Sequence, residues 1–218
     1  DVGGLPPNAL MPEDSPKPEP HGERQAGRSL SQIKPDHRAR YALAARWLWD
    51  HRALASRVLD AGCGNGYGAW MLANAGHHVL AVDASDEALA EADGFYPHAN
   101  VTLARHDILE PQDALPGIQH LDAAVCFEVI EHVREPERIV ANLAAWAPIL
   151  LASVPNEDVI PLAANPAPFH VKHYRKDELA EVLKPYEVKA WYCLKDKWSG
   201  IVHEGTDGRF MVACAVLP

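Results

Sequence analysis

Short apolar runs alternate with segments of helical periodicity along most of this chain. Seven runs have the length and apolar content of buried strands: residues 58–60, 78–83, 101–104, 121–127, 148–154, 187–194 and 209–217. Apolar residues with helical spacing predict helices at residues 36–52, 70–75, 86–94, 136–146 and 176–184. Strands that alternate with helices predict an α/β fold, with a mostly parallel sheet, helices on both faces and right-handed crossovers.

The last two strand patterns, residues 187–194 and 209–217, follow one another without a helical pattern between them. Consecutive strands at the end of an alternating chain favour an antiparallel hairpin at one edge of the sheet. The sequence therefore predicts one seven-stranded sheet that is mostly parallel and ends in an antiparallel C-terminal edge hairpin.

The N-terminal segment has a different composition. Residues 1–28 are rich in proline, glycine and charge, and such a segment buries too little apolar surface to offset its ordering entropy. We expect residues 1–30 to form a flexible arm and residues 31–218 to form a single domain. The arm is also the expected contact surface of a homo-oligomer.

The loop after the first strand has glycine at every second position. The strand ends in Asp60, and Gly62, Gly64, Gly66 and Gly68 follow. Glycine accepts positive φ and lets a ligand approach without a Cβ in the way. The free N–H groups at the start of the next helix face such a ligand. We therefore expect a nucleotide-like molecule at this loop.

The stretch 58–68, VLDAGCGNGYG, resembles the first motif of class I S-adenosylmethionine-dependent methyltransferases, in which an acidic residue precedes G-x-G-x-G. This resemblance implies a Rossmann-like fold. A dinucleotide-binding turn, G-x-G-x-x-G/A, is also satisfied by Gly64, Gly66 and Ala69. The loop by itself leaves both cofactors open, so the rest of the chain has to separate them.

Two further carboxylates favour the methyl donor. Asp83 ends the second strand about 20 residues after the glycine loop, where an acid accepts hydrogen bonds from ribose hydroxyls. In the resembled family, a carboxylate after the third strand holds the adenine amino group and the next residue packs on the ring; Asp107 and Ile108 occupy these positions. The predicted cofactor-binding residues are Asp60, Gly62, Cys63, Gly64, Gly66, Asp83, Ala84, Asp107, Ile108 and Glu128.

The fourth strand runs directly into the string FEVIEHV at residues 127–133. This string is similar to the corresponding segment of the ubiquinone-biosynthesis type of small-molecule O-methyltransferases. Ligands of open α/β sheets bind beyond the carboxyl ends of the strands, so Glu128, Glu131 and His132 are placed to meet a substrate. In small methyltransferases a helix before the first strand lies over the cofactor, which assigns Arg38 and Tyr41 to the substrate entrance.

Methyl transfer to a hydroxyl oxygen needs a group that removes the hydroxyl proton. Glu131, His132 and His170 are the predicted catalytic residues, and either imidazole has the chemistry of a general base. The alternative is a divalent cation. Ubiquinone-type and small-RNA 3′-end O-methyltransferases use a comparable Glu-x-x-Glu-His set with a later histidine to hold magnesium. The resemblance therefore implies Mg²⁺ at Glu128, Glu131, His132 and His170.

Charge and composition narrow the class of substrate. The formal net charge is −10 and the pI is about 5.6, which argues against sequence-independent binding to nucleic acid. The local basic cluster Lys172, His173, Arg175 and Lys176 keeps RNA 3′-end methylation open. No apolar run reaches the length of a membrane span and no signal peptide opens the sequence. We expect a cytoplasmic enzyme that methylates a small molecule on oxygen; a non-catalytic S-adenosylmethionine-binding protein and an NAD-dependent oxidoreductase are the alternatives.

Overall fold

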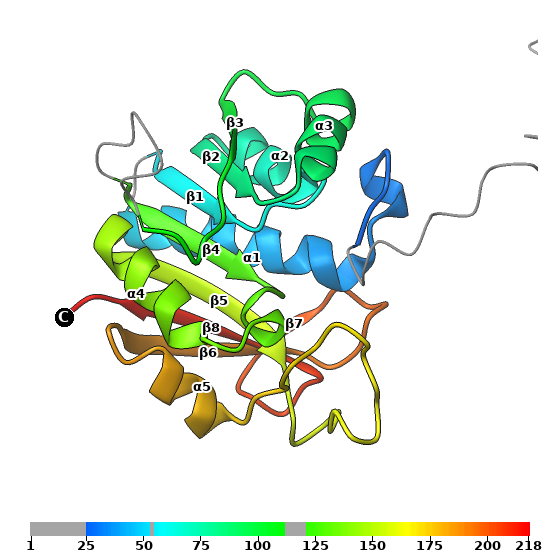
Figure 1. Ribbon diagram of the computed structural model, residues 1–218, viewed down its shortest axis with the longest axis vertical. Helices are drawn as coiled ribbons and strands as arrows, with labels where there is room; N and C mark the ends of the chain where they lie inside the picture. The colour runs from blue at the N-terminus through cyan, green and yellow to red at the C-terminus, as the bar shows by residue number, and fades with distance from the viewer. Residues whose placement is uncertain (1–24, 53–54, 112–120) are drawn as a thin grey trace, which may run out of the picture.

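The computed structural model describes residues 25–52, 55–111 and 121–218, and within these ranges eight strands form one sheet. The strand order is β3-β2-β1-β4-β5-β8-β6-β7 (Figure 1). The strands are β1 (Arg57–Ala61), β2 (His78–Asp83), β3 (Val101–Arg105), β4 (Ala123–Phe127), β5 (Ile149–Pro155), β6 (Glu187–Leu194), β7 (Val202–Glu204) and β8 (Phe210–Val216). β1 to β5 pair in parallel, whereas β8 pairs antiparallel with β5 and β6. The predicted mostly parallel sheet with an antiparallel C-terminal hairpin is confirmed.

The predicted number of seven strands is wrong by one. β7 lies between the last two predicted strands, where the pattern predicted no further strand, and it pairs antiparallel with Tyr192–Leu194 of β6. This strand has three residues, of which Val202 alone is apolar. Three residues are too few to show the alternation that identifies a strand in a sequence, so β7 left no signal.

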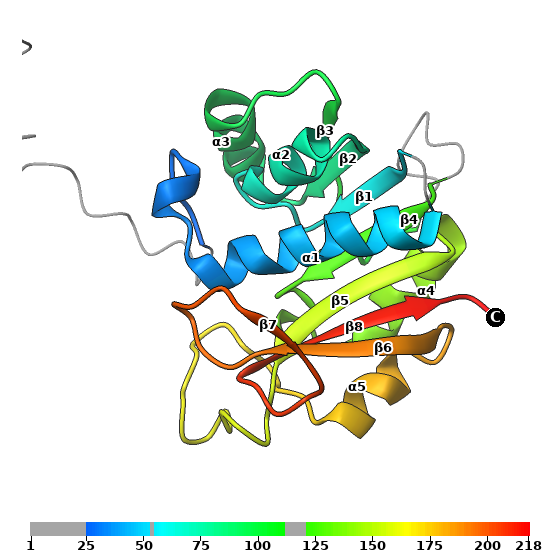
Figure 2. The same cartoon turned by 180° about the vertical axis from the view of Figure 1, so that it is seen from behind.

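Helices cover both faces of the sheet. They are α1 (Pro35–Arg52), α2 (Tyr67–Asn74), α3 (Asp86–Phe95), α4 (Pro136–Trp146) and α5 (Lys176–Val182). Figure 2 shows α1 running across one face, where it packs with α2, and Figure 1 shows α4 and α5 on the other face. One apolar cluster lies under α1 and α2 and a second lies under α4 and α5. The sheet is therefore the middle layer of a three-layer α/β domain.

The final residues of the predicted arm lie against this domain. The carbonyl oxygen of Gly27 accepts hydrogen bonds from Asn65 Nδ2 (3.0 Å) and the Tyr96 hydroxyl (2.8 Å), and the Arg28 guanidinium lies 5.4 Å from the centre of the Phe95 ring. These contacts hold residues 27 and 28 beside α2 and α3. Residues 1–24 of the predicted arm lie outside the described residues, and the role of the arm in an oligomer stays a prediction.

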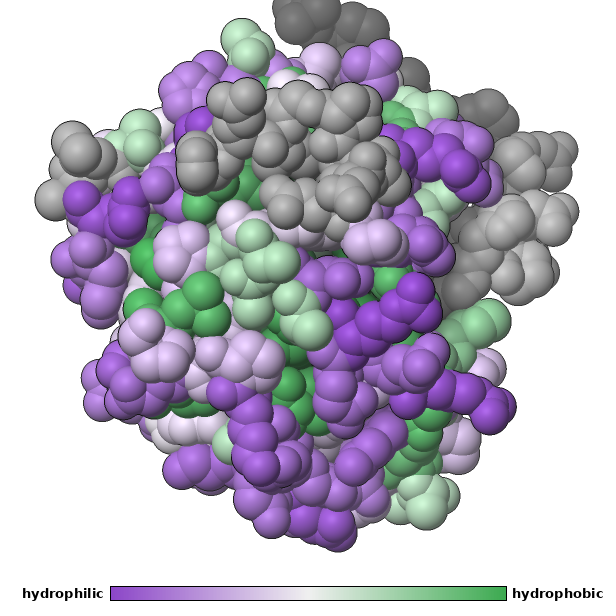
Figure 3. All heavy atoms as spheres, turned by 60° about the vertical axis from the view of Figure 1, so that its left-hand side comes forward, coloured by the Kyte–Doolittle hydropathy of each residue, from purple (hydrophilic) through white to green (hydrophobic). Residues whose placement is uncertain are grey.

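Hydrophilic side chains surround the hydrophobic ones on the face drawn in Figure 3. Among the described residues, no helix combines the length and the apolar content that a bilayer crossing requires.

The contact between α1 and α2 depends on Gly68. A Cβ at this position would lie 2.0 Å from Cζ of Tyr41. The Tyr41 ring is 4% exposed and packs edge-on against Tyr67 and Phe127, so it has little room to move. We expect Gly68→Ala to lower the free energy of unfolding by about 1–3 kcal/mol, the usual cost of overpacking, as measured by urea denaturation.

Gly94 provides the matched control for this substitution. It lies in α3, and no atom comes within 4 Å of a Cβ built there. Because alanine is a better helix former than glycine, Gly94→Ala is expected to leave stability unchanged or raise it by up to about 1 kcal/mol. Equal urea midpoints for the two variants would show that the Tyr41 contact does not limit packing.

Candidate functional site

Two cavities meet at the carboxyl ends of β1 and β4. The first, here called the Asp83 cavity, has a volume of about 530 Å³ and is lined by residues from the ends of β1, β2 and β3. The second, the His170 cavity, has a volume of about 590 Å³ and lies between α1, the glycine loop and residues 155–173. Four residues line both cavities: Gly62, Gly64, Glu128 and His132. A ligand at these four residues extends into both spaces.

The glycine loop is held against the end of β2. The N–H groups of Gly62 and Cys63 both donate to the Val82 carbonyl oxygen at 2.9 Å. Gly62 has a φ of 79°, and Gly64 donates its N–H to Oδ2 of Asp83 at 2.9 Å. Hydrogen bonds to β2 therefore fix the loop while its other side faces the cavities.

Gly66 has a different position from the other predicted glycines. It is the N-cap of α2 with a φ of 84°, and a Cβ on it would lie 2.6 Å from the Cβ of Ala92 in α3. It lines neither of the two cavities. Gly66 thus allows α3 to approach the loop, and its direct contact with a cofactor stays a prediction.

The Asp83 cavity brings together the residues predicted for the adenosine half of a cofactor. Asp83, Ala84, Asp107 and Ile108 all line it. Oδ1 of Asp83 accepts the Ser85 N–H at 2.9 Å and Oδ2 accepts the Gly64 N–H at the same distance. These two hydrogen bonds hold the Asp83 carboxylate at the cavity wall, between the glycine loop and the start of α3. Asp107 accepts the N–H of Leu109 at 3.0 Å through Oδ1, which fixes its side chain at the cavity wall.

Asp60 lies below the loop and lines neither cavity. It is fully buried and accepts a hydrogen bond from the Tyr41 hydroxyl at 3.0 Å. Burial raises the pKa of its carboxyl to about 7, although the Tyr41 hydrogen bond acts in the opposite direction. Asp60 holds the loop and α1 together, and its predicted cofactor contact stays a prediction.

The raised pKa of Asp60 predicts a pH-dependent stability. The unfolded carboxyl titrates near 3.9, so between about pH 4 and pH 7 the folded protein binds the extra proton. Its contribution to stability is present below about pH 4 and is lost as the pH rises to about 7, by up to about 1.4 kcal/mol per pH unit. Asp60→Asn keeps an acceptor for Tyr41 and removes this titration. Urea unfolding from pH 4 to pH 8 is expected to show that the free energy of unfolding of the variant rises relative to that of the wild type as the pH rises. If the two proteins showed the same pH dependence, the raised pKa of Asp60 would be contradicted.

Glu128 occupies a strained position at the end of β4. It has a φ of 56°, the only positive value of a non-glycine residue in the part of the chain that the structure describes. Its carboxylate accepts a hydrogen bond from the Ser153 hydroxyl at 2.9 Å and lies 3.6 Å from Nη2 of Arg40. The side chain therefore projects toward Arg40 of α1, and Glu128 lines both cavities.

Three of the four predicted metal ligands form a cluster. Glu131, His132 and His170 each offer a ligand atom, and these atoms lie within 4.8 Å of one another. Glu128 is not a member of this group. Residues three and four apart share one side of a helical turn, but Glu128 precedes the short 3-10 helix η3 (Ile130–His132) and has left-handed backbone geometry. This conformation turns its side chain toward Arg40.

The cluster is held from both of its segments. Glu131 is fully buried, and its carbonyl oxygen accepts the N–H of Val171 at 2.7 Å. The His132 and His170 rings lie edge to face with centroids 4.6 Å apart. This backbone contact ties η3 to the loop of residues 168–173, which explains why residues about 40 positions apart in sequence meet here.

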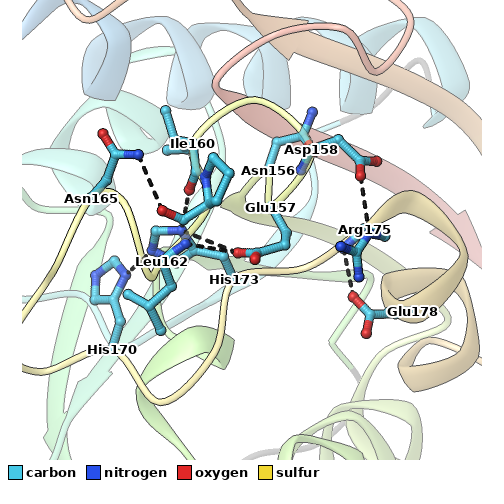
Figure 4. A network of polar contacts seen from close by, with 11 residues as sticks. Asn156, Glu157, Asp158, Ile160, Leu162, Asn165, His170, His173, Arg175 and Glu178 are labelled. Atoms are coloured by element: carbon cyan, nitrogen blue, oxygen red, sulfur yellow. Dashed lines mark hydrogen bonds and ion pairs between the residues drawn. The ribbon is translucent and has the colours of Figure 1, made fainter.

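Hydrogen bonds orient both histidines of the cluster. Nδ1 of His132 lies 3.0 Å from the carbonyl oxygen of Phe169. Nδ1 of His170 lies 2.8 Å from Nε2 of His173, whose own Nδ1 lies 2.7 Å from the carbonyl oxygen of Ile160 (Figure 4). A carbonyl oxygen only accepts, so the Nδ1 atoms of His132 and His173 carry a proton. In the neutral rings Nε2 of His173 then accepts from Nδ1 of His170, which puts the lone pairs of His132 and His170 on their Nε2 atoms.

Sequence reasoning missed the role of His173. It is 4% exposed and connects His170 to Ile160. The sequence shows it only as a second histidine three residues after His170, and we assigned it to a basic cluster. The contact with Ile160, which is 13 residues away, has no sequence signal.

The predicted entrance helix contributes His37, Arg40 and Tyr41 to the His170 cavity, while Arg38 is not among the lining residues. His37 was not predicted. Its Nδ1 lies 3.0 Å from the Tyr67 hydroxyl, and burial, with help from nearby cations, lowers its pKa to about 2. His37 is therefore neutral across the physiological range.

Comparison with known families gives one consistent result. A family model described as a methyltransferase domain matches residues 29–203. A probable S-adenosylmethionine-dependent methyltransferase of Mycobacterium tuberculosis is 36% identical over 137 residues, which cover 61% of this chain and 48% of the relative. A ubiquinone biosynthesis O-methyltransferase of Paraburkholderia phymatum is 33% identical over 111 residues, which cover 50% of this chain and 47% of the relative. The chain thus spans about half the length of these curated relatives.

Solved structures share the fold at low sequence identity. The magnesium protoporphyrin IX methyltransferase of Synechocystis with bound SAH superposes with a TM-score of 0.64 at 19% identity and covers 84% of each chain. The methyltransferase domain of bacterial CtHen1 superposes with a TM-score of 0.63 at 18% identity, covering 83% of this chain and 98% of that one. Likeness at this level concerns the arrangement of the sheet and helices.

Proposed function

The chain belongs to the methyltransferase domain family of S-adenosylmethionine-dependent enzymes, and we propose that it transfers the methyl group to a hydroxyl oxygen of a small-molecule acceptor. The observation that supports this most directly is the junction of the two cavities at Gly62, Gly64, Glu128 and His132. Adenosine in the Asp83 cavity would place the sulfonium at this junction. The methyl group would then face the His170 cavity, where the acceptor binds.

Each side of the junction has a separate task in this proposal. Asp83 accepts hydrogen bonds from the ribose, Asp107 holds the adenine amino group and Ile108 packs on the ring. Glu128 supplies negative charge beside the positive sulfonium. Methyl transfer is an in-line displacement, so the protein's main contribution is to align the acceptor oxygen with the methyl carbon.

The acceptor proton is removed at the Glu131, His132 and His170 cluster. Nε2 of either histidine carries the lone pair that a general base needs, because Nδ1 is committed to Phe169 or to His173. His132 lines both cavities, which makes it the imidazole placed to reach an acceptor oxygen near the methyl group.

The same cluster fits a divalent cation. A buried carboxylate and two imidazoles, each with a ligand atom within 4.8 Å of the others, form a two-histidine, one-carboxylate set. A cation bound there would occupy the lone pairs that a general base needs, so it would act in place of the imidazoles, by lowering the pKa of the acceptor hydroxyl. Imidazole ligands suit transition metals better than Mg²⁺, which prefers oxygen. We therefore extend the predicted Mg²⁺ to Mn²⁺ and related ions.

A metal requirement has a direct test. We expect EDTA to abolish formation of S-adenosylhomocysteine from S-adenosylmethionine and any hydroxylated acceptor that the protein methylates, and Mg²⁺ or Mn²⁺ to restore it. Calorimetric titration of Mn²⁺ should show one site that His170→Ala removes, whereas His203→Ala, an exposed histidine of β7, should retain it. Turnover that resists the chelator would leave His132 and His170 as bases without a metal.

The alternative activities have less support. The basic cluster considered for RNA is largely occupied. Arg175 pairs with Asp158 at 3.0 Å (Figure 4), Lys172 pairs with Glu178 at 2.8 Å, and His173 is buried. A non-catalytic binding protein would not need the oriented histidines beside the donor site. A cytoplasmic location stays a prediction from the sequence.

A further inference from the structure

The acidic residues of the His170 cavity all have basic neighbours. Arg40 lies 3.4 Å from Asp36 and 3.6 Å from Glu128, and it is 1% exposed. Glu131 lies in the cluster with His132 and His170. These contacts account for the three carboxylates that line the cavity.

Three more cationic side chains line the same cavity: Lys34, Lys197 and Arg209. None of them forms an ion pair with another residue in the described ranges, although most other lysines and several arginines do. All three are half-buried. Lysine and arginine side chains are usually exposed, so three half-buried ones without an acidic partner in the described ranges give this cavity a local positive charge.

The fold holds the two lysines on one side of the cavity. Lys34 directly precedes α1, and Lys197 lies in the loop between β6 and β7. A Cβ built on Gly200 of this loop would lie 3.2 Å from Pro35, so the loop packs against the start of α1. The pKa of His37 is consistent with the same arrangement. Burial lowers it most, and the positive charges of Arg40, Lys34 and Lys197 lower it further.

Arg209 adds the third cation from the sheet. It directly precedes β8, and its carbonyl oxygen accepts the Asn156 N–H at 2.9 Å, which fixes its backbone beside the end of β5. Its side chain lines the cavity next to Phe210. Cations from three separate segments thus converge on one space of about 590 Å³, a volume suited to a small molecule.

We propose that the acceptor carries an oxyanion group, a carboxylate or a phosphate, which Lys34, Lys197 and Arg209 bind while its hydroxyl faces His132. This inference rests on the proposed function and adds the chemical class of the acceptor. Charge-assisted hydrogen bonds to an oxyanion are about twice as strong as neutral ones. They would orient the acceptor by the end opposite to the reacting oxygen.

Unreactive anions test the site without turnover. Benzoate, phenyl phosphate and the neutral isostere benzamide are titrated by calorimetry into protein saturated with S-adenosylhomocysteine. We expect at least one anion to bind 10-fold or more tightly than benzamide. Which of the two anions binds more tightly shows whether the acceptor carries a carboxylate or a phosphate. The double variant Lys34→Met/Lys197→Met should weaken that anion by at least 10-fold.

Lys195 offers a matched control in the same loop. It pairs with Asp207 at 3.0 Å and does not line the cavity, so Lys195→Met should change anion affinity less than twofold. Equal binding of benzamide and the anions, or an equal loss in Lys195→Met, would overturn the inference. Failure of the wild type to bind S-adenosylhomocysteine would instead contradict the proposed function. In a turnover assay, 3,4-dihydroxybenzoate or a catechol phosphate should be preferred over 3,4-dihydroxybenzamide.

Discussion

Replacing Asp83 by alanine is expected to weaken the binding of S-adenosylhomocysteine by roughly 100-fold or more. Its carboxylate lines the Asp83 cavity and already accepts the N–H groups of Gly64 and Ser85, both at 2.9 Å. The substitution removes the ribose acceptor and releases the glycine loop. A hydrogen bond to a charged group contributes about 1.5–3 kcal/mol, or roughly 10- to 150-fold in affinity for each one lost.

Two neighbouring substitutions make this result interpretable. Asp86→Ala removes an exposed carboxylate three residues away that pairs with Arg105 at 3.3 Å, and it should change affinity less than twofold. Asp83→Asn keeps one acceptor oxygen and should fall between alanine and the wild type. Calorimetric titration gives the affinity for S-adenosylhomocysteine of the wild type and of the three variants. Wild-type affinity in Asp83→Ala would show that the cofactor does not use this end of β2.

The elements of the fold that the sequence predicted best have strong local patterns. β2 and α4 begin and end where their apolar spacing predicted. β2 is apolar up to its terminal carboxylate, and α4 carries a continuous apolar stripe. The start of α1 is an exception, because the pattern predicted a helix from residue 36, whereas α1 begins at Pro35 and Asp36 pairs with Arg40 within the first turn. Proline is favoured at the first helical position, which the sequence pattern alone did not resolve.

The geometry of the site depends on contacts that local patterns do not encode. The spacing of Glu128 and Glu131 suggested one shared side, but a backbone φ of 56° at Glu128 separates them. The link from His170 through His173 to Ile160 joins parts of an irregular loop. The types of residue at the site could therefore be predicted from the sequence, whereas their partners required the tertiary structure.

Arg40→Met is expected to lower the free energy of unfolding by about 3–5 kcal/mol, the usual cost of removing one partner of a buried ion pair. The Arg40 side chain is 1% exposed and serves both Asp36 and Glu128, and its guanidinium lies 4.5 Å from the centre of the Phe210 ring. Methionine fills most of the same volume, so the decrease in the free energy of unfolding reports the loss of the positive charge rather than the opening of a cavity. Urea denaturation at pH 8 gives the difference.

Arg46→Met, in the same helix, separates burial from charge. Arg46 pairs with Asp50 at 3.5 Å, but both side chains are mostly exposed, so its loss should cost less than about 0.5 kcal/mol.

The pH dependence of the Arg40→Met defect provides a second check. Burial already raises the pKa of Asp36 even with Arg40 beside it, and without the guanidinium the carboxyl would take up a proton more readily. Because a raised folded pKa gives stability at low pH that is lost as the pH rises, the Arg40→Met defect should shrink toward pH 5, and Asp36→Asn should partly rescue it at pH 8. An equal loss at both pH values would mean that Arg40 acts through packing on Phe210, and that Asp36 and Glu128 do not need its charge to remain at the junction of the two cavities.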